Sequence, residues 1–183
     1  MSEELIVRHC SPTLAGLKTA NMFSCSFTSK EETVKQIRAL NRRLSGKGIR
    51  VLPLRYGERS VLIYIYRPKK LKDDLRHSEA ESILKCCGYS CHSPEKCIVS
   101  LIDKLKNGQD FPHEIGLFLG YPAEDVRGFI EHGARTSKLV GHWRVYGDEE
   151  RARKAFAKFK KCTEVYTRKF TRGNSLDKLT VSV

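Results

Sequence analysis

The chain has 183 residues, a formal net charge of +13 and 40% hydrophobic residues. This length and composition are typical of a globular protein with its own apolar core, and we expect a single domain over residues 1–183. No apolar run approaches the length of a membrane span and no secretory signal is present, which predicts a cytoplasmic protein without a membrane partner. Seven irregularly spaced cysteines then predict reduced thiols. The positive charge makes nucleic acid, phosphorylated small molecules and acidic proteins plausible partners, and it does not choose among them.

The N-terminal segment places a thiol beside a histidine. Residues 3–8 predict a short helix that ends at His9 and Cys10, and the Ser-Pro pair that follows predicts a second helix over residues 12–23. A cysteine just before a helix N-terminus has a lowered pKa and a more available thiolate, so Cys10 is a candidate nucleophile. The alternative is that Cys10 is a small buried hydrophobic residue.

A helix and two strands are predicted next. Residues 29–44 combine a capping box with an apolar stripe at helical spacing, which predicts an amphipathic helix. Residues 49–56 and 60–66 predict an antiparallel hairpin. Pro53 places the first strand at an edge of the sheet, because proline cannot donate to a strand ladder. The second strand is apolar on both faces and is expected to be central.

Clustered cations form two candidate anion sites. One directly follows the predicted central strand. The other lies on a long basic helix expected over residues 148–173, which starts with acidic residues as the helix dipole favours. The alternatives are an ordinary solvated loop and the solvent face of an amphipathic helix. The residues expected to bind anions are Arg67, Lys69, Lys70, Lys158 and Lys161.

Residues 111–147 contain the only tryptophan and a dense series of turn residues. They predict a helix, a tight turn and a second helix over residues 113–131, with Asp110 as a possible N-cap, followed by a strand over residues 139–146. The spacing is that of a helix-turn-helix. The second helix carries three carboxylates that would oppose DNA phosphates, so we interpret this geometry as packing.

A histidine–glutamate pair lies at the start of the first of these helices. A helix N-terminus favours the neutral form of histidine, so His113 is a candidate base, acid or ligand, with Glu114 as the group that orients it. The alternative is that His113 hydrogen-bonds locally and Glu114 offsets the helix dipole.

Four cysteines and a histidine lie close together in residues 86–97. Their spacing contains no Cys-x-x-Cys pair and no second pair that would complete a tetrahedral zinc site. We therefore predict no metal site there, and expect core packing for at least two of these thiols.

Four segments together resemble an uncharacterised bacterial family, domain-of-unknown-function family 3793: HCSPTLAGLKTAN, FPHEIGLFLGYP, DVRGFI and WRVYGD. The resemblance covers nearly the whole chain, and it leaves out the cysteine-rich segment. It implies a free-standing cytoplasmic protein and no particular activity or ligand. The recurring residues, as they stand here, are His9, Cys10, Pro12, Thr13, Gly16, Lys18, Asn21, His113, Glu114, Gly116, Gly120, Tyr121, Pro122, Trp143 and Tyr146.

These sequence patterns are compatible with two functions. The first is a small-ligand or enzymatic site that joins the two histidine-containing motifs, with no cofactor indicated. Its catalytic candidates are Cys10, His113 and Glu114, and its ligand-binding candidates are His9, Lys18, Asn21, Tyr121, Trp143 and Tyr146. The alternative is a binding module for nucleic acid or an acidic protein that uses the basic C-terminal helix. The expected fold is α+β, with five to seven helices packed on a small, mostly antiparallel sheet.

Overall fold

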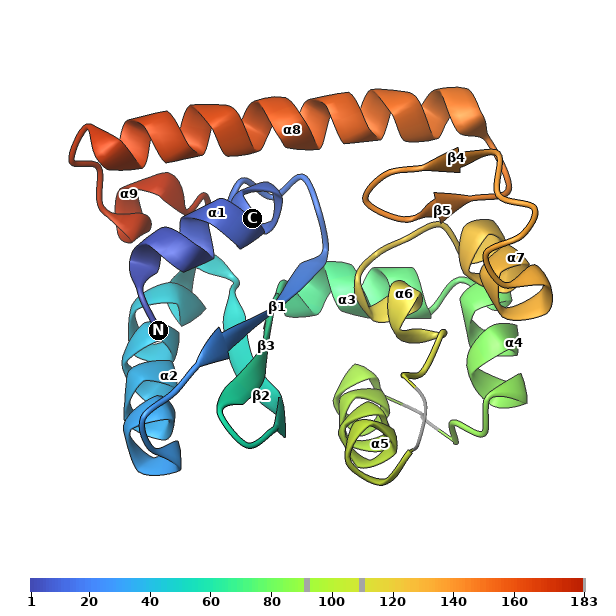
Figure 1. Ribbon diagram of the computed structural model, residues 1–183, viewed down its shortest axis with the longest axis horizontal. Coiled ribbons are helices and arrows are strands. Elements are labelled where there is room, and N and C mark those ends of the chain that lie inside the picture. The colour runs from blue at the N-terminus through green and yellow to red at the C-terminus, as the bar shows by residue number, and fades with distance from the viewer. Residues whose placement is uncertain (91–92, 109–110, 183) are drawn as a thin grey trace. The chain divides into compact units, whose positions relative to one another are not determined.

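A computed structural model describes residues 1–90, 93–108 and 111–182 (Figure 1). The chain divides into two compact units. Unit 1 comprises Met1–Lys69 and the chain from Phe159 onward, and unit 2 comprises Lys70–Lys158. The long helix α8 (Glu149–Thr171) has residues in both. The expected α+β class is confirmed, and a single domain over the whole chain stays a prediction.

Unit 1 is built on a three-stranded antiparallel sheet with the strand order β1-β3-β2. The strands are β1 (Ala20–Ser26), β2 (Arg50–Tyr56) and β3 (Ser60–Tyr66). The predicted hairpin, the central position of its second strand and the edge position of its first strand are all confirmed. The register of β2 shifts between Pro53 and Arg55, as expected where a proline interrupts an edge strand.

The helices of unit 1 pack on this sheet. They are α1 (Glu3–Leu14), α2 (Lys30–Leu44), the short 3-10 helix η1 (Ser45–Lys47) and α9 (Leu176–Leu179). The capping box predicted for α2 is half confirmed, because the Ser29 hydroxyl accepts a hydrogen bond of 3.1 Å from the Glu32 amide.

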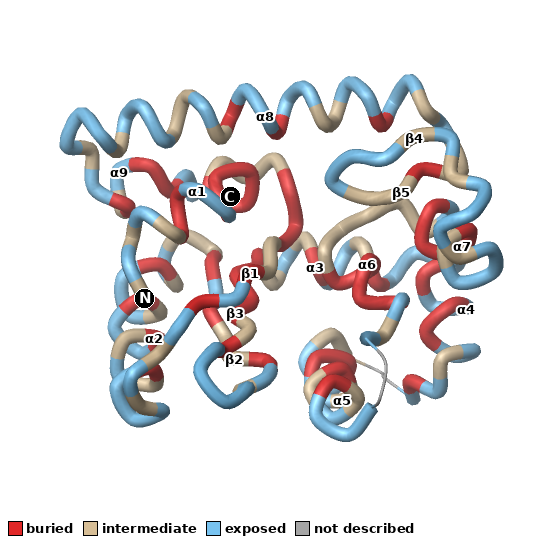
Figure 2. The backbone as a smooth tube through the Cα atoms, viewed as in Figure 1, coloured by how far each residue is buried: buried red, intermediate tan, exposed pale blue. Residues whose placement is uncertain are grey.

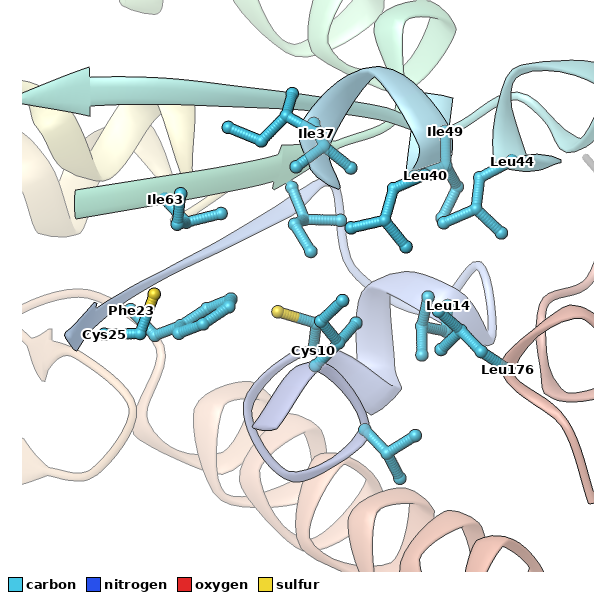
Figure 3. Close-up of a cluster of buried hydrophobic side chains, with 14 of the residues drawn as sticks. Cys10, Leu14, Phe23, Cys25, Ile37, Leu40, Leu44, Ile49, Ile63 and Leu176 are labelled. Atoms are coloured by element: carbon cyan, nitrogen blue, oxygen red, sulfur yellow. The ribbon is translucent and has the colours of Figure 1, made fainter. Parts of the chain in front are cut away.

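The core of unit 1 lies on one face of the sheet (Figure 3). Alternate residues of β3 face it, namely Val61, Ile63 and Ile65, because side chains alternate along a strand. Helices α1, α2 and α9 supply the opposing side chains. Figure 3 shows the Cys10 side chain among them, on the same layer as Leu14 and Phe23.

Three predictions for unit 1 were wrong. One continuous helix, α1, replaces the two expected before residue 23, and Pro12 lies in its last turn, where few intrahelical bonds are lost. Residues 20–26 form β1 because they pair with β3 along their full length, which outweighs a weak local helix preference. An edge strand was also predicted from Lys178 to the C-terminus, but the described residues form no strand there, and the short helix α9 covers Leu176–Leu179.

Unit 2 is mainly helical. Its helices are α3 (Pro68–Leu75, which begins at the boundary), α4 (Ser78–Cys86), α5 (Pro94–Asn107), α6 (Ile115–Phe118) and α7 (Ala123–His132). The predicted helix–turn–helix corresponds to α6 and α7, joined through Gly120 at φ 71°. The described residues form nine α-helices, more than the expected five to seven, and two of the nine, α6 and α9, are single turns of four residues.

Two predictions for residues 111–146 were wrong in extent. Helix α6 is one turn long, because the carbonyls of Pro112 and His113 accept bonds from amides three residues on, at 3.3 and 3.4 Å. The expected strand over residues 139–146 is a small hairpin of β4 (Leu139–Val140) and β5 (Arg144–Val145). The possible N-cap Asp110 lies outside the described residues. Across the parts of the chain that the structure describes, no helix has both the length and the apolar character needed to cross a bilayer.

Candidate functional site

Residues 111–144 of unit 2 enclose a pocket of about 220 Å³. Three of the predicted site residues line it together: the catalytic candidate His113 and the ligand-binding candidates Tyr121 and Trp143. The remaining lining residues are Phe111, Pro112, Ile115, Gly116, Asp125, Val126, Phe129 and Arg144. Five of the eleven lining residues carry a ring of Phe, His, Tyr or Trp, so rings form a large share of the pocket wall.

The aromatic rings of the pocket pack against one another and against neighbouring rings. His113 meets Phe129 edge to face, with ring centroids 4.8 Å apart. Tyr121 lies beside Trp143 at 5.0 Å, and Trp143 in turn meets Phe156 of α8 edge to face at 4.5 Å. Burial raises the pKa of Tyr121 to about 12, so its hydroxyl stays protonated at neutral pH.

Asp125, in the first turn of α7, organises the pocket. One carboxylate oxygen accepts the Trp143 indole N–H at 2.7 Å, and the other accepts the backbone amides of Tyr146 and Gly147 at 2.7 and 2.8 Å. The side chain is almost fully buried. Asp125 thereby ties α7 to the segment that carries Trp143, and it fixes the orientation of the indole ring.

Asp125 was not predicted as a site residue, and was counted only as one of three carboxylates that oppose DNA binding. Its partners lie 18 to 22 residues further along the chain, so no local spacing connects them. The only signal in the sequence that could have indicated this role was the position of Asp125, next to the apolar Val126 in a helix that precedes the only tryptophan.

Two glycines allow the close packing around the pocket. A Cβ at Gly116 would lie 2.7 Å from Val126 and 3.0 Å from Tyr121. A Cβ at Gly128 would lie 2.4 Å from the ring of Tyr146, so this ring packs directly on the backbone of α7. Tyr146 therefore supports the pocket from behind and is absent from its lining, and its hydroxyl donates to the Gly133 carbonyl.

Glu114 points to different partners from its neighbour His113. The buried carboxylate accepts a hydrogen bond of 3.0 Å from the Tyr89 hydroxyl and lies 3.4 Å from Lys104 Nζ. Among the described residues it makes no hydrogen bond with His113. The expected role of Glu114 as the group that orients His113 is therefore unsupported, and its charge is balanced by Lys104.

Cys10 corrects the prediction of an activated thiol. It lies inside α1, where its exposed fraction is 0%, and its sulfur is surrounded by the apolar core. Burial raises the pKa of the Cys10 thiol, because the thiolate would lose its hydration there. The expected lowering of the pKa was wrong, since no helix begins after Cys10. Cys10 is instead a small buried residue of the hydrophobic core, as the alternative interpretation predicted.

The other unit 1 candidates have structural partners. His9 is exposed and stacks on Phe23 with ring centroids 5.2 Å apart, and burial against it, followed by the charge of Arg8, lowers the pKa of His9. The Asn21 side-chain oxygen accepts a hydrogen bond of 2.7 Å from the Thr13 hydroxyl, which joins the end of α1 to β1. These residues belong to unit 1, while His113 and Glu114 belong to unit 2, so neither unit by itself holds both motifs.

The buried Lys18 side chain is expected to make the free energy of unfolding depend on pH. Burial lowers the pKa of Lys18 from 10.5 to about 8, so between these values the folded protein binds fewer protons than the unfolded chain and gains stability as pH rises. We expect the free energy of unfolding of the wild type, relative to Lys18→Met, to rise by about 1 kcal/mol from about pH 8 to about pH 9. Urea unfolding at both pH values measures this. A flat or falling difference would contradict it. Cys10 acts in the opposite direction once thiols of the unfolded chain ionise near 9.0.

Arg67 is not the anion site predicted after the central strand. It is 2% exposed, and four of its N–H donors go to backbone carbonyls. The acceptors are Thr13 at 2.7 Å, Leu14 at 2.8 Å, Val181 at 2.9 Å and Lys47 at 3.1 Å. A guanidinium has five such donors, so almost none remains for an anion. Arg67 instead binds the end of α1 and the C-terminal segment together.

The predicted lysines lie at the surface. Lys69 is exposed and Lys70 half-buried in the first turn of α3, and Lys158 and Lys161 are exposed on α8. None of the four forms an ion pair with a described residue. Figure 2 shows α8 as mostly exposed, with buried positions spaced along one side.

The cysteine-rich segment is only partly described. Cys86 is exposed, Cys87 half-buried and Cys97 buried in α5, while Cys91 and His92 lie outside the described residues. Over the residues that are described, no group of three or more His, Cys, Asp or Glu side chains has the arrangement of a metal site.

Fold and pocket together define an α+β protein with an aromatic pocket beside a helix–turn–helix. The model of the family described as "Protein of unknown function (DUF3793)" matches residues 6–180, and the chain belongs to this family. No curated protein and no solved structure matches the chain.

Proposed function

We propose that the pocket of unit 2 binds a small aromatic ligand that carries an acidic group. The observation that carries this proposal is the ring-lined pocket of about 220 Å³. An engineered apolar cavity of about 150 Å³ holds benzene, so this pocket has room for one ring and a substituent. Ring-to-ring contacts at the faces and edges of the lining side chains favour a flat ligand.

The polar groups of the pocket favour an acidic substituent. The Asp125 carboxylate already accepts three hydrogen bonds and needs no cation from a ligand. Arg144 makes only long hydrogen bonds, at 3.5 Å to the Ala134 carbonyl and 3.4 Å to the Ser137 hydroxyl. Its guanidinium therefore has donors to offer to a carboxylate. His113 is the lining group suited to proton transfer, so a reaction in this pocket would use it as base or acid.

Benzoate and benzyl alcohol are the probes that test this proposal. Trp143 lines the pocket and is the only tryptophan of the chain, so its fluorescence reports on occupancy directly. We expect a saturable change with benzoate and an affinity about tenfold lower for Arg144→Gln, because a hydrogen-bonded charge is lost. Phe111→Ala, which removes a half-exposed ring at the pocket, is expected to weaken both probes.

The matched control is Arg135→Gln, an exposed arginine of the same unit that does not line the pocket. It is expected to bind benzoate like the wild type. Equal affinity for both probes would remove the acidic group from the proposal. No saturable change with either probe would remove the pocket as the ligand site.

A second candidate is binding of a polyanion through α8. Near the start of this helix, Arg153 and Lys154 pair with glutamates one turn earlier, whereas the exposed lysines from Lys158 to Lys161 have no such pair among the described residues. Unpaired cations on one helix favour phosphate contacts. We expect a short oligothymidylate to bind, and its affinity to fall in the Lys158→Gln, Lys161→Gln double variant and with added salt. Unchanged binding in the double variant would remove α8 as the site.

A further inference from the structure

Three arginines of unit 1 line an open groove of about 490 Å³, whereas the aromatic pocket belongs to unit 2. Arg38 and Arg42 lie one turn apart on the exposed face of α2, and Arg50 begins the edge strand β2. Asn41 of α2 and Ser45, the first residue of η1, complete the lining. The spacing of Arg38, Asn41 and Arg42, at i, i+3 and i+4, places them along one side of α2.

Asn41 holds the two walls of the groove together. Its side-chain amide donates to the Val51 carbonyl at 2.9 Å, and its oxygen accepts from the Val51 amide at 2.8 Å. This pair of hydrogen bonds fixes α2 to β2 at the residue next to Arg50. The two walls of the groove are therefore linked beneath the three exposed arginine side chains.

The positive charge of the groove is not compensated within the described residues. Arg38, Arg42 and Arg50 form no ion pair there, whereas the adjacent Arg43 binds both Glu3, at 2.7 Å, and Asp177. Glu3 and Asp177 therefore neutralise Arg43, which joins α1, α2 and α9, and not the arginines of the groove. Three guanidiniums left together repel one another, and an anion would relieve that repulsion.

We propose that this groove binds a ligand with two or more phosphate groups. Guanidinium forks match phosphate oxygens and can form paired hydrogen bonds with them. The lining contains no aromatic or aliphatic side chain, so recognition rests on the phosphates and not on the group that carries them. Three forks along one groove fit successive phosphates, which occur both in small diphosphates and in the sugar–phosphate backbone of nucleic acids.

Titrations with inorganic diphosphate and with a short oligothymidylate distinguish these two sources. In phosphate-free buffer, calorimetry on the full chain is expected to show binding of at least one probe, weakened about tenfold by Arg38→Gln or Arg42→Gln. For the oligothymidylate, each variant is also expected to lower the dependence of log affinity on log salt by about 0.7, the value for one lost phosphate contact. Arg59→Gln, an exposed arginine in the turn between β2 and β3, is the matched control and is expected to change neither quantity.

Each outcome decides the proposal. Diphosphate binding that weakens in the groove variants supports a small diphosphate ligand, and a loss confined to the oligothymidylate supports a nucleic-acid backbone. The proposal is overturned if neither probe binds more weakly to the groove variants than to the wild type, and also if neither probe binds at all. The benzoate titration in unit 2 does not depend on any of these residues, so the two sites succeed or fail separately.

Discussion

Replacing Arg67 with methionine is expected to lower the free energy of unfolding by about 4 kcal/mol. The guanidinium binds four backbone carbonyls, two of them at the end of α1 and one in the C-terminal segment. Methionine fills much of the space but donates nothing, so all four carbonyls would lose a charged donor. The carbonyls of Thr13 and Leu14 would keep only the amides of Gly16 and Val181, at 3.1 and 3.0 Å. Urea unfolding followed by far-ultraviolet circular dichroism measures the loss.

The control for Arg67 is Arg59→Met, which removes the same charge from an exposed turn of unit 1. Its expected effect is within about 0.5 kcal/mol of zero. A loss below about 1 kcal/mol for Arg67→Met would show that water or neighbouring donors replace the guanidinium, and would contradict its role at the end of α1.

Replacing Asp125 with alanine is expected to lower the free energy of unfolding by about 3 kcal/mol and to abolish binding of benzoate at Trp143. The substitution leaves three N–H donors without their acceptor: the Trp143 indole and the amides of Tyr146 and Gly147. Because the indole would lose its fixed orientation, the pocket would lose one wall. Unfolding monitored by Trp143 fluorescence reports on the stability, and the benzoate titration reports on the site.

Asp125→Asn separates the two effects. Asparagine keeps one acceptor oxygen and places an amide where the other oxygen was, so it is expected to lose about half as much stability as alanine. Glu131→Ala removes an exposed carboxylate from the same helix and is expected to change neither stability nor binding. Wild-type benzoate affinity in a folded Asp125→Ala protein would show that the indole is positioned by other contacts.

Local sequence signals predicted the parts of the fold whose determinants are local. The cap of α2 and the hairpin of β2 and β3 needed only Ser29, Pro53 and the apolar run of β3. In each case the chemical reason is short-range: a hydroxyl that accepts an amide, or a ring that cannot donate. These elements appear in the structure close to their predicted bounds.

Elements determined by distant partners were mispredicted. Residues 20–26 form a strand because they pair with β3, some forty residues later, in an antiparallel register that runs from Ala20↔Tyr66 to Ser26↔Ser60. Cys10 is buried because α1 continues past it and turns that face toward the sheet. No spacing within the first 26 residues contains either fact, since both depend on packing that forms across the chain.

The candidate site was predicted in its rings and missed in its polar support. His113, Tyr121 and Trp143 were singled out and do line one pocket. Asp125 and Arg144 were not singled out, because their positions depend on how α7 meets the β4–β5 hairpin. For Cys10, the expected lowering of the thiol pKa was wrong because the side chain is buried, and burial raises that pKa.

The Asn41 side chain also protects unit 1 against association through its sheet. An edge strand exposes amides and carbonyls to which a strand of another chain can add. In β2, the outward amide and carbonyl of Val51 are both taken by Asn41, and Pro53 has no amide to offer. The register shift after Pro53 and the exposed charges of Arg50 and Arg55 interrupt the rest of this edge. Asn41→Leu would expose the amide and carbonyl of Val51 as a docking point for a second strand, and so leave this sheet edge prone to aggregation.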